Sequence, residues 1–252
     1  MPATISAAII TLNEERNIGR CLDSLKWADE IVVVDAGSTD RTLEICKERN
    51  CRVYENAWEG FAEQKNLSLD RAACDWILSI DADEEVTPEL REEIRSIIDS
   101  PSPADAYSMP RRNWFLGKFM GHGSWYPDRQ LRLLRRDAGR FKIVPLHEHL
   151  ELRPGARVER MTNPLLHYTY PSVSDFLRKA DSYTSIAAET MVKEGRRPKS
   201  LIFSMMVAFP AKFFEVYVYK GGWKDGLHGI IAAMLLSERA FVKSLKVWEK
   251  LR

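Results

Sequence analysis

Short runs of apolar residues alternate with stretches of helical periodicity through the first hundred residues of the chain. Buried strands of a parallel sheet are continuous apolar runs, whereas amphipathic helices repeat apolar residues every three or four positions. The apolar runs predict strands at residues 5–12, 30–35, 52–54 and 76–81. The helical spacing predicts helices at residues 18–25, 42–49, 61–73 and 88–98.

This alternation is typical of an α/β fold with an open, mostly parallel sheet and helices on both faces. In such sheets, ligands bind beyond the carboxyl ends of the strands. Polar side chains follow the predicted strands at these ends, namely Asn13, Glu14, Asp35, Asp81 and Asp83. Because parallel strands end along one edge, we expect these residues to converge on one crevice that binds a nucleotide.

The stretch Asp81-Ala82-Asp83 places two carboxylates where an apolar run ends. Crowded carboxylates repel one another, and Mg²⁺ takes oxygen ligands, often with substrate phosphates completing its shell. The pattern therefore predicts a divalent cation held against a nucleotide diphosphate. The alternative is an acidic helix start, but Thr87-Pro88-Glu89 is a better one. We interpret only Glu84 and Glu85 as helix-start charges.

The pattern of apolar and polar residues changes after residue 100. Residues 101–170 contain short strand-like pieces, and helical spacing dominates after Pro171. We predict a catalytic domain at 1–170, divided into halves at 1–100 and 101–170, and a helical extension at 171–252. Lysines and aromatic residues in the extension suit helices in a membrane interface. The alternative is packing onto the catalytic domain or an oligomer interface, and the oligomeric state stays open.

Composition narrows the class further. A hydrophobic fraction of 45% and a charged fraction of 29% are typical of a globular protein. The net charge of +1 gives no basic footprint for nucleic acid. No run approaches the roughly 20 apolar residues of a membrane span. The first residues lack the pattern of a secretory signal, so we expect a cytoplasmic location.

Three motifs stand in order along the first part of the chain. They are Thr11-Leu12-Asn13-Glu14, Asp35-Ala36-Gly37-Ser38-Thr39-Asp40 and Asp81-Ala82-Asp83. Together they resemble family 2 of the inverting glycosyltransferases, which have the GT-A fold, over roughly residues 4–100. Farther on, Arg129-Gln130-Leu131-Arg132-Leu133, His147-Glu148 and His167-Tyr168 resemble the lipopolysaccharide core β-glucosyltransferase subgroup.

The resemblance implies a role for each matching position. Asp35 would accept a hydrogen bond from uracil, Asp83 would bind the metal, and Asp81 would meet the ribose or the metal. His167 would complete the metal shell. The implied nucleotide-sugar site consists of Thr11, Asn13, Glu14, Asp35, Gly37, Lys65, Asn66, Asp81, Ala82, Asp83, Arg129 and Arg132. Lys65 would equally suit a solvated helix surface.

These roles imply a metal-dependent hexosyltransferase that uses Mg²⁺ or Mn²⁺ and a UDP-sugar. The acceptor would be a lipid-linked or lipopolysaccharide-core saccharide, at the cytoplasmic face of the inner membrane. Inversion requires a base that takes the proton of the acceptor hydroxyl. We favour Glu148 as that base, with Asp128 as its rival.

Other functions fit the pattern less well. A nucleotidyltransferase also holds a cation at strand ends, but it predicts a Gly-rich phosphate loop where this chain has Thr11-Leu12-Asn13-Glu14-Glu15. A dinucleotide oxidoreductase predicts a GxGxxG turn, and the first predicted helix does not open with one. A membrane-associated module that binds a nucleotide sugar without catalysis stays open.

Overall fold

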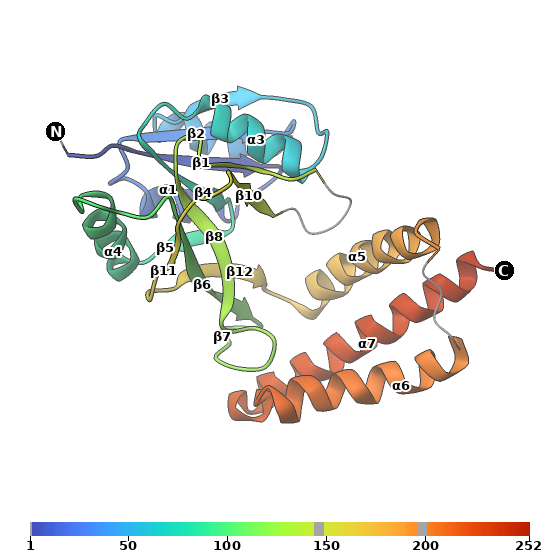
Figure 1. Ribbon diagram of the computed structural model, residues 1–252. Helices are drawn as coiled ribbons and strands as arrows, with labels where there is room; N and C mark the ends of the chain where they lie inside the picture. The colour runs from blue at the N-terminus through green and yellow to red at the C-terminus, as the bar shows by residue number, and fades with distance from the viewer. Residues whose placement is uncertain (1, 144–148, 196–200) are drawn as a thin grey trace. The chain divides into compact units, whose positions relative to one another are not determined.

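The computed structural model describes residues 2–143, 149–195 and 201–252 (Figure 1). The chain divides into two compact units. The first unit comprises residues 1–111 and 129–168, and the second comprises residues 112–128 and 169–252. The division differs from the predicted boundary at residue 170 mainly because residues 112–128 group with the C-terminal helices.

The first unit is built on four parallel strands in the order β3-β2-β1-β4. They are β1 (Ile5–Thr11), β2 (Glu30–Asp35), β3 (Arg52–Glu55) and β4 (Trp76–Asp81). In this register Thr11 lies opposite Asp35, and Ile10 lies opposite Asp81. The carboxyl ends of β1, β2 and β4 therefore meet at one edge of the sheet, as the sequence predicts.

Helices cover both faces of this sheet (Figure 1). They are α1 (Ile18–Ser24), α2 (Thr42–Glu48), α3 (Phe61–Arg71) and α4 (Pro88–Ile98). Side chains alternate between the faces of a strand. Accordingly, Ile5 and Ile9 of β1 pack in a core with residues of α1, α2 and α4, whereas Ala8 packs in a second core with residues of α3.

The sheet continues beyond β4 in the order β8-β6-β12-β5. These strands are β5 (Glu84–Val86), β6 (Ala106–Phe115), β8 (Asp128–Arg135) and β12 (Leu165–Tyr170). β8 runs antiparallel to β4, and β12 runs antiparallel to β5. Short strands β7 (Lys118–Phe119) and β11 (Val158–Arg160) pair with β6, while β9 (Gly139–Phe141) and β10 (Leu150–Leu152) form a separate pair.

The second unit is helical. It contains α5 (Val173–Lys193), α6 (Leu201–Phe213), the π-helix η1 (Phe214–Tyr219), the 3₁₀ helix η2 (Gly222–Asp225) and α7 (Leu227–Lys250). Helix α7 packs against both α5 and α6 (Figure 1). No helix in the described part of the chain is long and apolar enough to cross a membrane.

Residues 112–128 belong to this unit because a buried carboxylate and an apolar core hold them there. Asp225 accepts hydrogen bonds from the backbone N–H groups of Gly121 and His122, the latter at 2.8 Å, and pairs with Lys118 at 3.4 Å. The core joins both parts of the unit through Phe115, Met120, Trp125, Tyr170, Phe176 and Ala232.

Candidate functional site

Asp35 at the end of β2 holds its own turn together. The carboxylate is completely buried and accepts hydrogen bonds from the N–H groups of Gly37 and Ser38 at 2.8 and 2.7 Å, and from the Ser38 hydroxyl at 2.5 Å. Gly37 has a φ of 92°, which favours glycine. Asp35 therefore shapes the loop, and the predicted hydrogen bond to uracil stays a prediction.

The loop after β1 is tied to this turn. Asn13, at a φ of 54°, accepts a hydrogen bond from the Thr39 N–H at 2.8 Å, and its own N–H donates to the Ser38 hydroxyl at 2.8 Å. Glu14 accepts a hydrogen bond from the Asn17 side chain at 2.8 Å. The hydroxyl of Thr11 is buried without a hydrogen-bond partner in the described part of the chain. Thr11 thus offers an unsatisfied polar atom beside the strand edge.

Two cations meet Asp81 at the end of β4. Lys65 of α3 lies 3.1 Å from one carboxylate oxygen, and Arg132 of β8 donates to the other at 2.5 Å. The side chains of Lys65 and Arg132 are only 6% and 4% exposed. Lys65 is therefore a buried partner of the site and not a solvated surface lysine. Both oxygens of Asp81 are already engaged by protein cations.

These neighbours set the ionisation of Asp81. Burial on its own would raise the pKa of this carboxyl group, but the positive charges of Arg132 and Lys65 outweigh it and hold the pKa well below its usual value of 3.8. Asp81 is therefore a carboxylate at neutral pH. Because both of its oxygens face cations, it is poorly suited to bind a metal ion directly.

Glu84 and Glu85 correct the interpretation of the acidic cluster. Glu84 is completely buried, belongs to β5, and accepts hydrogen bonds from the Asp81 N–H at 2.9 Å and from Arg132 at 2.8 Å. Glu85 accepts a hydrogen bond from the Tyr168 hydroxyl at 2.7 Å. The prediction of helix-start charges was wrong because the chain turns back into a strand before α4, which Thr87 caps.

Asp83 lies beside a histidine from a distant strand. The carboxylate is 3.3 Å from Nε2 of His167, and the Tyr168 N–H donates to the Asp83 carbonyl at 2.9 Å. The side chains of Asp83 and His167 are 14% and 12% exposed, respectively. In residues 2–143, 149–195 and 201–252, no cluster of three or more Asp, Glu, His or Cys side chains is arranged to hold a metal. The Asp83 carboxylate is nevertheless an oxygen ligand of the kind that Mg²⁺ and Mn²⁺ prefer when substrate phosphates complete the shell, whereas imidazole is more usual at softer metals.

Arg20 and Tyr168 flank this pair, and no sequence motif pointed to Arg20. Its guanidinium lies 3.4 Å from the centroid of the Tyr168 ring, and it pairs with Glu85 at 3.6 Å. Burial, reinforced by the hydrogen bond to Glu85, raises the pKa of Tyr168 to about 12. This arrangement fixes β12 next to Asp83. In the sequence, only the position of Tyr168 next to His167 could have pointed to this arrangement of Arg20, Tyr168 and Glu85.

Two predicted nucleotide ligands have structural partners instead. Arg129 donates to the backbone carbonyls of Ser108 and Met161 at 3.4 and 3.1 Å. The Asn66 side chain both donates to and accepts from the backbone of Phe141, at 2.9 and 2.8 Å. Of the two arginines expected near phosphate, Arg132 lies beside Asp81 at the strand ends. The guanidinium of Arg129 is hydrogen-bonded to backbone carbonyls.

Glu148 and Asp128 are the two predicted bases on the acceptor side. Glu148 and His147 lie outside the described residues. Asp128 belongs to the second unit, where it accepts a hydrogen bond from the Asn113 side chain at 3.4 Å. Both assignments of the base therefore stay predictions.

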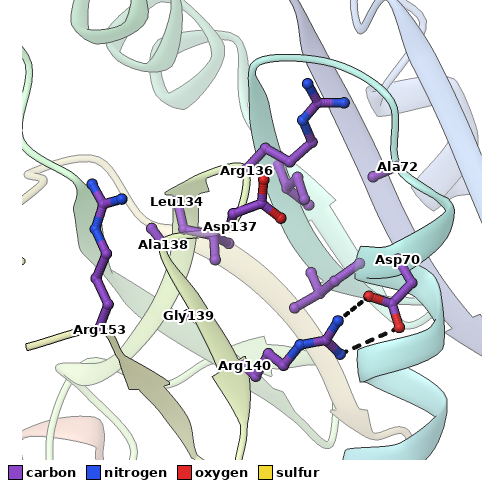
Figure 2. Close-up of a pocket in the computed structure, with 11 residues that line it drawn as sticks. Asp70, Ala72, Leu134, Arg136, Asp137, Ala138, Gly139, Arg140 and Arg153 are labelled. Carbon is purple, nitrogen blue, oxygen red and sulfur yellow. Dashed lines mark hydrogen bonds and ion pairs between the residues drawn. The ribbon is translucent and has the colours of Figure 1, made fainter.

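A cavity of about 430 Å³ lies at the opposite ends of the strands (Figure 2). Its lining includes Arg136, Arg140, Arg153, Asp70 and Asp137, together with apolar side chains such as Leu134. Arg140 pairs with Asp70 across it, as Figure 2 shows. Among the described residues, none of those predicted for catalysis or nucleotide binding lines this cavity, so it is separate from the strand ends of the candidate site.

The sequence model of the family "Glycosyl transferase family 2" matches residues 6–153, more than half of the 252-residue chain. The chain belongs to glycosyltransferase family 2. The match includes the ends of β1, β2 and β4, whereas His167 of β12 lies beyond it. It confirms the predicted family, the GT-A fold and a glycosyltransferase activity, and it sets aside the nucleotidyltransferase alternative.

Relatives of this glycosyltransferase extend over nearly its whole length. The lipopolysaccharide core biosynthesis glycosyltransferase LpsC of Rhizobium meliloti is 31% identical over 252 residues, covering 98% of this chain and 92% of that protein. An uncharacterized glycosyltransferase of Rickettsia bellii is 28% identical, with coverages of 97% and 86%. Among solved structures, S. aureus TarS in complex with UDP-GlcNAc is 15% identical, with coverages of 99% and 91% and a TM-score of 0.49.

Proposed function

We propose that this glycosyltransferase moves a hexose from a UDP-sugar, with inversion, to a hydroxyl of a lipid-linked or lipopolysaccharide-core saccharide. The observation that carries the proposal is the pairing of Asp81 with Lys65 and Arg132, next in the chain to the Asp83–His167 pair. Similarity to a protein named for lipopolysaccharide core biosynthesis supports this class of acceptor.

Asp83 and His167 would hold Mg²⁺ or Mn²⁺ together with the diphosphate of the donor. When bound, such a cation supplies positive charge that stabilises the departing diphosphate. Asp81, engaged by Lys65 and Arg132, would instead orient the ribose hydroxyls. The Asp83 carboxylate and the phosphate oxygens are the hard ligands that both metals prefer, and His167 would complete the shell.

Loops at the ends of β1 and β2 would bind the uridine. Asn13, Ser38 and Thr39 join these loops, and the unsatisfied hydroxyl of Thr11 lies in register with Asp35. In the folded turn, Asp35 acts by holding Gly37 and Ser38 in place. It would bind uracil directly only if this turn opened. On the acceptor side, Glu148 or else Asp128 would take the proton of the attacking hydroxyl.

The second unit would bring the enzyme to the cytoplasmic face of the inner membrane as a peripheral protein. Helix α6 contains no acidic residue, and its Ile202, Phe203 and Met206 are 73%, 66% and 74% exposed. Exposed apolar residues continue through Tyr219, Trp223 and Leu227, accompanied by Lys220 and Lys224. Exposed apolar side chains with lysines beside them suit the interfacial region of a bilayer.

A donor screen by thermal unfolding tests the proposal. UDP-glucose, UDP-galactose and UDP-N-acetylhexosamines are each added with Mn²⁺, beside GDP- and CMP-sugars. Because a ligand that binds the folded state stabilises it by mass action, at least one UDP-sugar should raise Tm while the GDP- and CMP-sugars leave it unchanged. A shift only with GDP- or CMP-sugars would overturn the assignment of uridine.

A further inference from the structure

Glu84 is a completely buried carboxylate that none of the predicted roles uses. One of its oxygens accepts a hydrogen bond from the Asp81 N–H at 2.9 Å, and the other accepts from Arg132 at 2.8 Å and from Arg111 at 3.2 Å. We propose that Glu84 is a positioning residue for the donor, which sets the direction of Arg132 and the conformation of the turn that begins at Asp81. The inference rests on the proposed use of a UDP-sugar.

The contacts of Arg132 show how Glu84 acts. A single terminal nitrogen of the guanidinium donates both to Asp81, at 2.5 Å, and to Glu84, at 2.8 Å. The guanidinium is planar and rigid, so two acceptors at one nitrogen fix where its other nitrogens point. Its Nε is buried and has no hydrogen-bond partner in the described part of the chain. Arg132 thus holds a donor ready for an acceptor that a ligand would bring.

The charges of the cluster point to an anion as that ligand. Lys65, Arg111 and Arg132 gather round the carboxylates of Asp81 and Glu84. Cations at a strand end suit the anionic oxygens of a nucleoside diphosphate, which form strong hydrogen bonds with a guanidinium donor such as the Nε of Arg132. Removing the charge of Glu84 would take away one of the two carboxylates that hold Arg132 in place. Arg132 would then turn towards Asp81 and leave both residues less suited to the donor.

The Asp81 N–H gives Glu84 a second effect. Its bond to Glu84 closes the turn between β4 and β5, and this turn carries Asp83 as well. However, the side chain of Asp83 contacts His167 of β12, whereas that of Glu84 holds Arg132 of β8. Changing Glu84 should therefore weaken nucleotide binding more than metal binding. This split separates positioning of the donor from a general loss of structure.

The variant Glu84→Gln keeps the shape of the side chain and removes its charge. Glu92→Gln is the control, because Glu92 is an exposed carboxylate that pairs with Arg91 and has no part in the candidate site. Three quantities are measured: the Kd of UDP in saturating Mn²⁺ by calorimetry, the Kd of Mn²⁺ alone, and Tm. Should Glu84→Gln not fold, Glu84→Asp replaces it, since it keeps the charge but is too short to meet both Asp81 and Arg132.

We expect the change at Glu84 to raise the Kd of UDP by about tenfold, in line with the loss of one charged hydrogen bond. The Kd of Mn²⁺ should stay within about twofold, and Glu92→Gln should leave both constants within about twofold. An unchanged Kd of UDP in the folded variant, or equal losses for UDP and Mn²⁺, would overturn the role of Glu84. Failure of the wild-type protein to bind UDP would instead contradict the proposed function.

Discussion

Asp81, Asp83 and Glu84 carry the same chemical group within four residues, yet each meets different partners. Asp81 faces Lys65 and Arg132, Asp83 faces His167, and Glu84 turns inward to Arg132. The sequence was sufficient to select the acidic stretch. It could not assign the roles within it, because the partners come from β8 and β12, which are distant in the chain.

The assignment of the metal to Asp83 predicts the behaviour of Asp83→Asn. The amide keeps the shape of the side chain but is a much weaker ligand than a carboxylate, so the Kd of Mn²⁺ should rise by at least about tenfold. The control is Asp23→Asn, which removes an exposed carboxylate that pairs with Arg49. Calorimetric titration with Mn²⁺ checks both variants. Unchanged binding by Asp83→Asn would contradict the assignment.

The raised pKa of Tyr168 predicts a late ionisation. Because the folded state favours the protonated phenol, the stabilisation is fully present below about pH 10 and is lost as the pH rises towards about 12. The measurement is the difference in absorbance at the phenolate band between the wild-type protein and Tyr168→Phe. A midpoint near the ordinary value of a tyrosine would show that the contact with Glu85 does not form.

Elements of the first hundred residues follow their sequence patterns closely. The predicted strand at residues 76–81 is β4, Trp76–Asp81, and the predicted helix at residues 88–98 is α4, Pro88–Ile98. Local patterns sufficed here because β1, β2 and β4 are largely buried on both faces, so that each is a continuous apolar run. Beyond residue 100 the pairing of β8 with β4 joins residues more than fifty positions apart, and no local pattern contains that register.

Close packing of two glycines in the second unit gives a prediction about elements. A methyl group added to Gly229 in the first turn of α7 would overlap the carbonyl oxygen of Gly222. We expect Gly229→Ala to lower the free energy of unfolding by about 2 kcal/mol, since the backbone of η2 has to move.

The control for that variant is Gly19→Ala in α1. Its methyl group would come no closer than 3.4 Å, to the flexible end of Arg49, so this variant should be neutral or slightly stabilised by its higher helix propensity. Urea unfolding compares the two variants. A neutral Gly229→Ala would mean that η2 and α7 are not packed as described.

At the scale of the whole molecule, the two units differ in the kind of surface that they present. The first unit carries the charged clusters at its strand ends, whereas the second exposes large apolar side chains along α6, η1 and η2. Such a surface is costly in water unless something covers it. A bilayer would cover this apolar surface, and so would a second copy of the chain. The test therefore has to distinguish the two.

Vesicle sedimentation tests the membrane proposal. Wild-type protein should bind vesicles that contain anionic lipid more strongly than neutral ones, because lysines add electrostatic attraction near an anionic surface. The double variant that combines Phe203→Glu with Met206→Glu should reduce the fraction of protein bound to vesicles by about fivefold or more. The control, Ile186→Glu, changes a partly exposed apolar residue of α5. Unchanged binding, or a dimer that these substitutions dissociate, would contradict the membrane role.

The most direct test of glycosyl transfer at the strand ends is the release of UDP. Purified protein receives each UDP-hexose, Mn²⁺ and a bacterial glycolipid extract as acceptor. With at least one donor we expect UDP release that needs both the acceptor and Mn²⁺ and falls by at least about a hundredfold in Asp83→Asn, as for the loss of a charge-stabilising group. Release at the wild-type rate by Asp83→Asn, or in the presence of EDTA, would contradict the account.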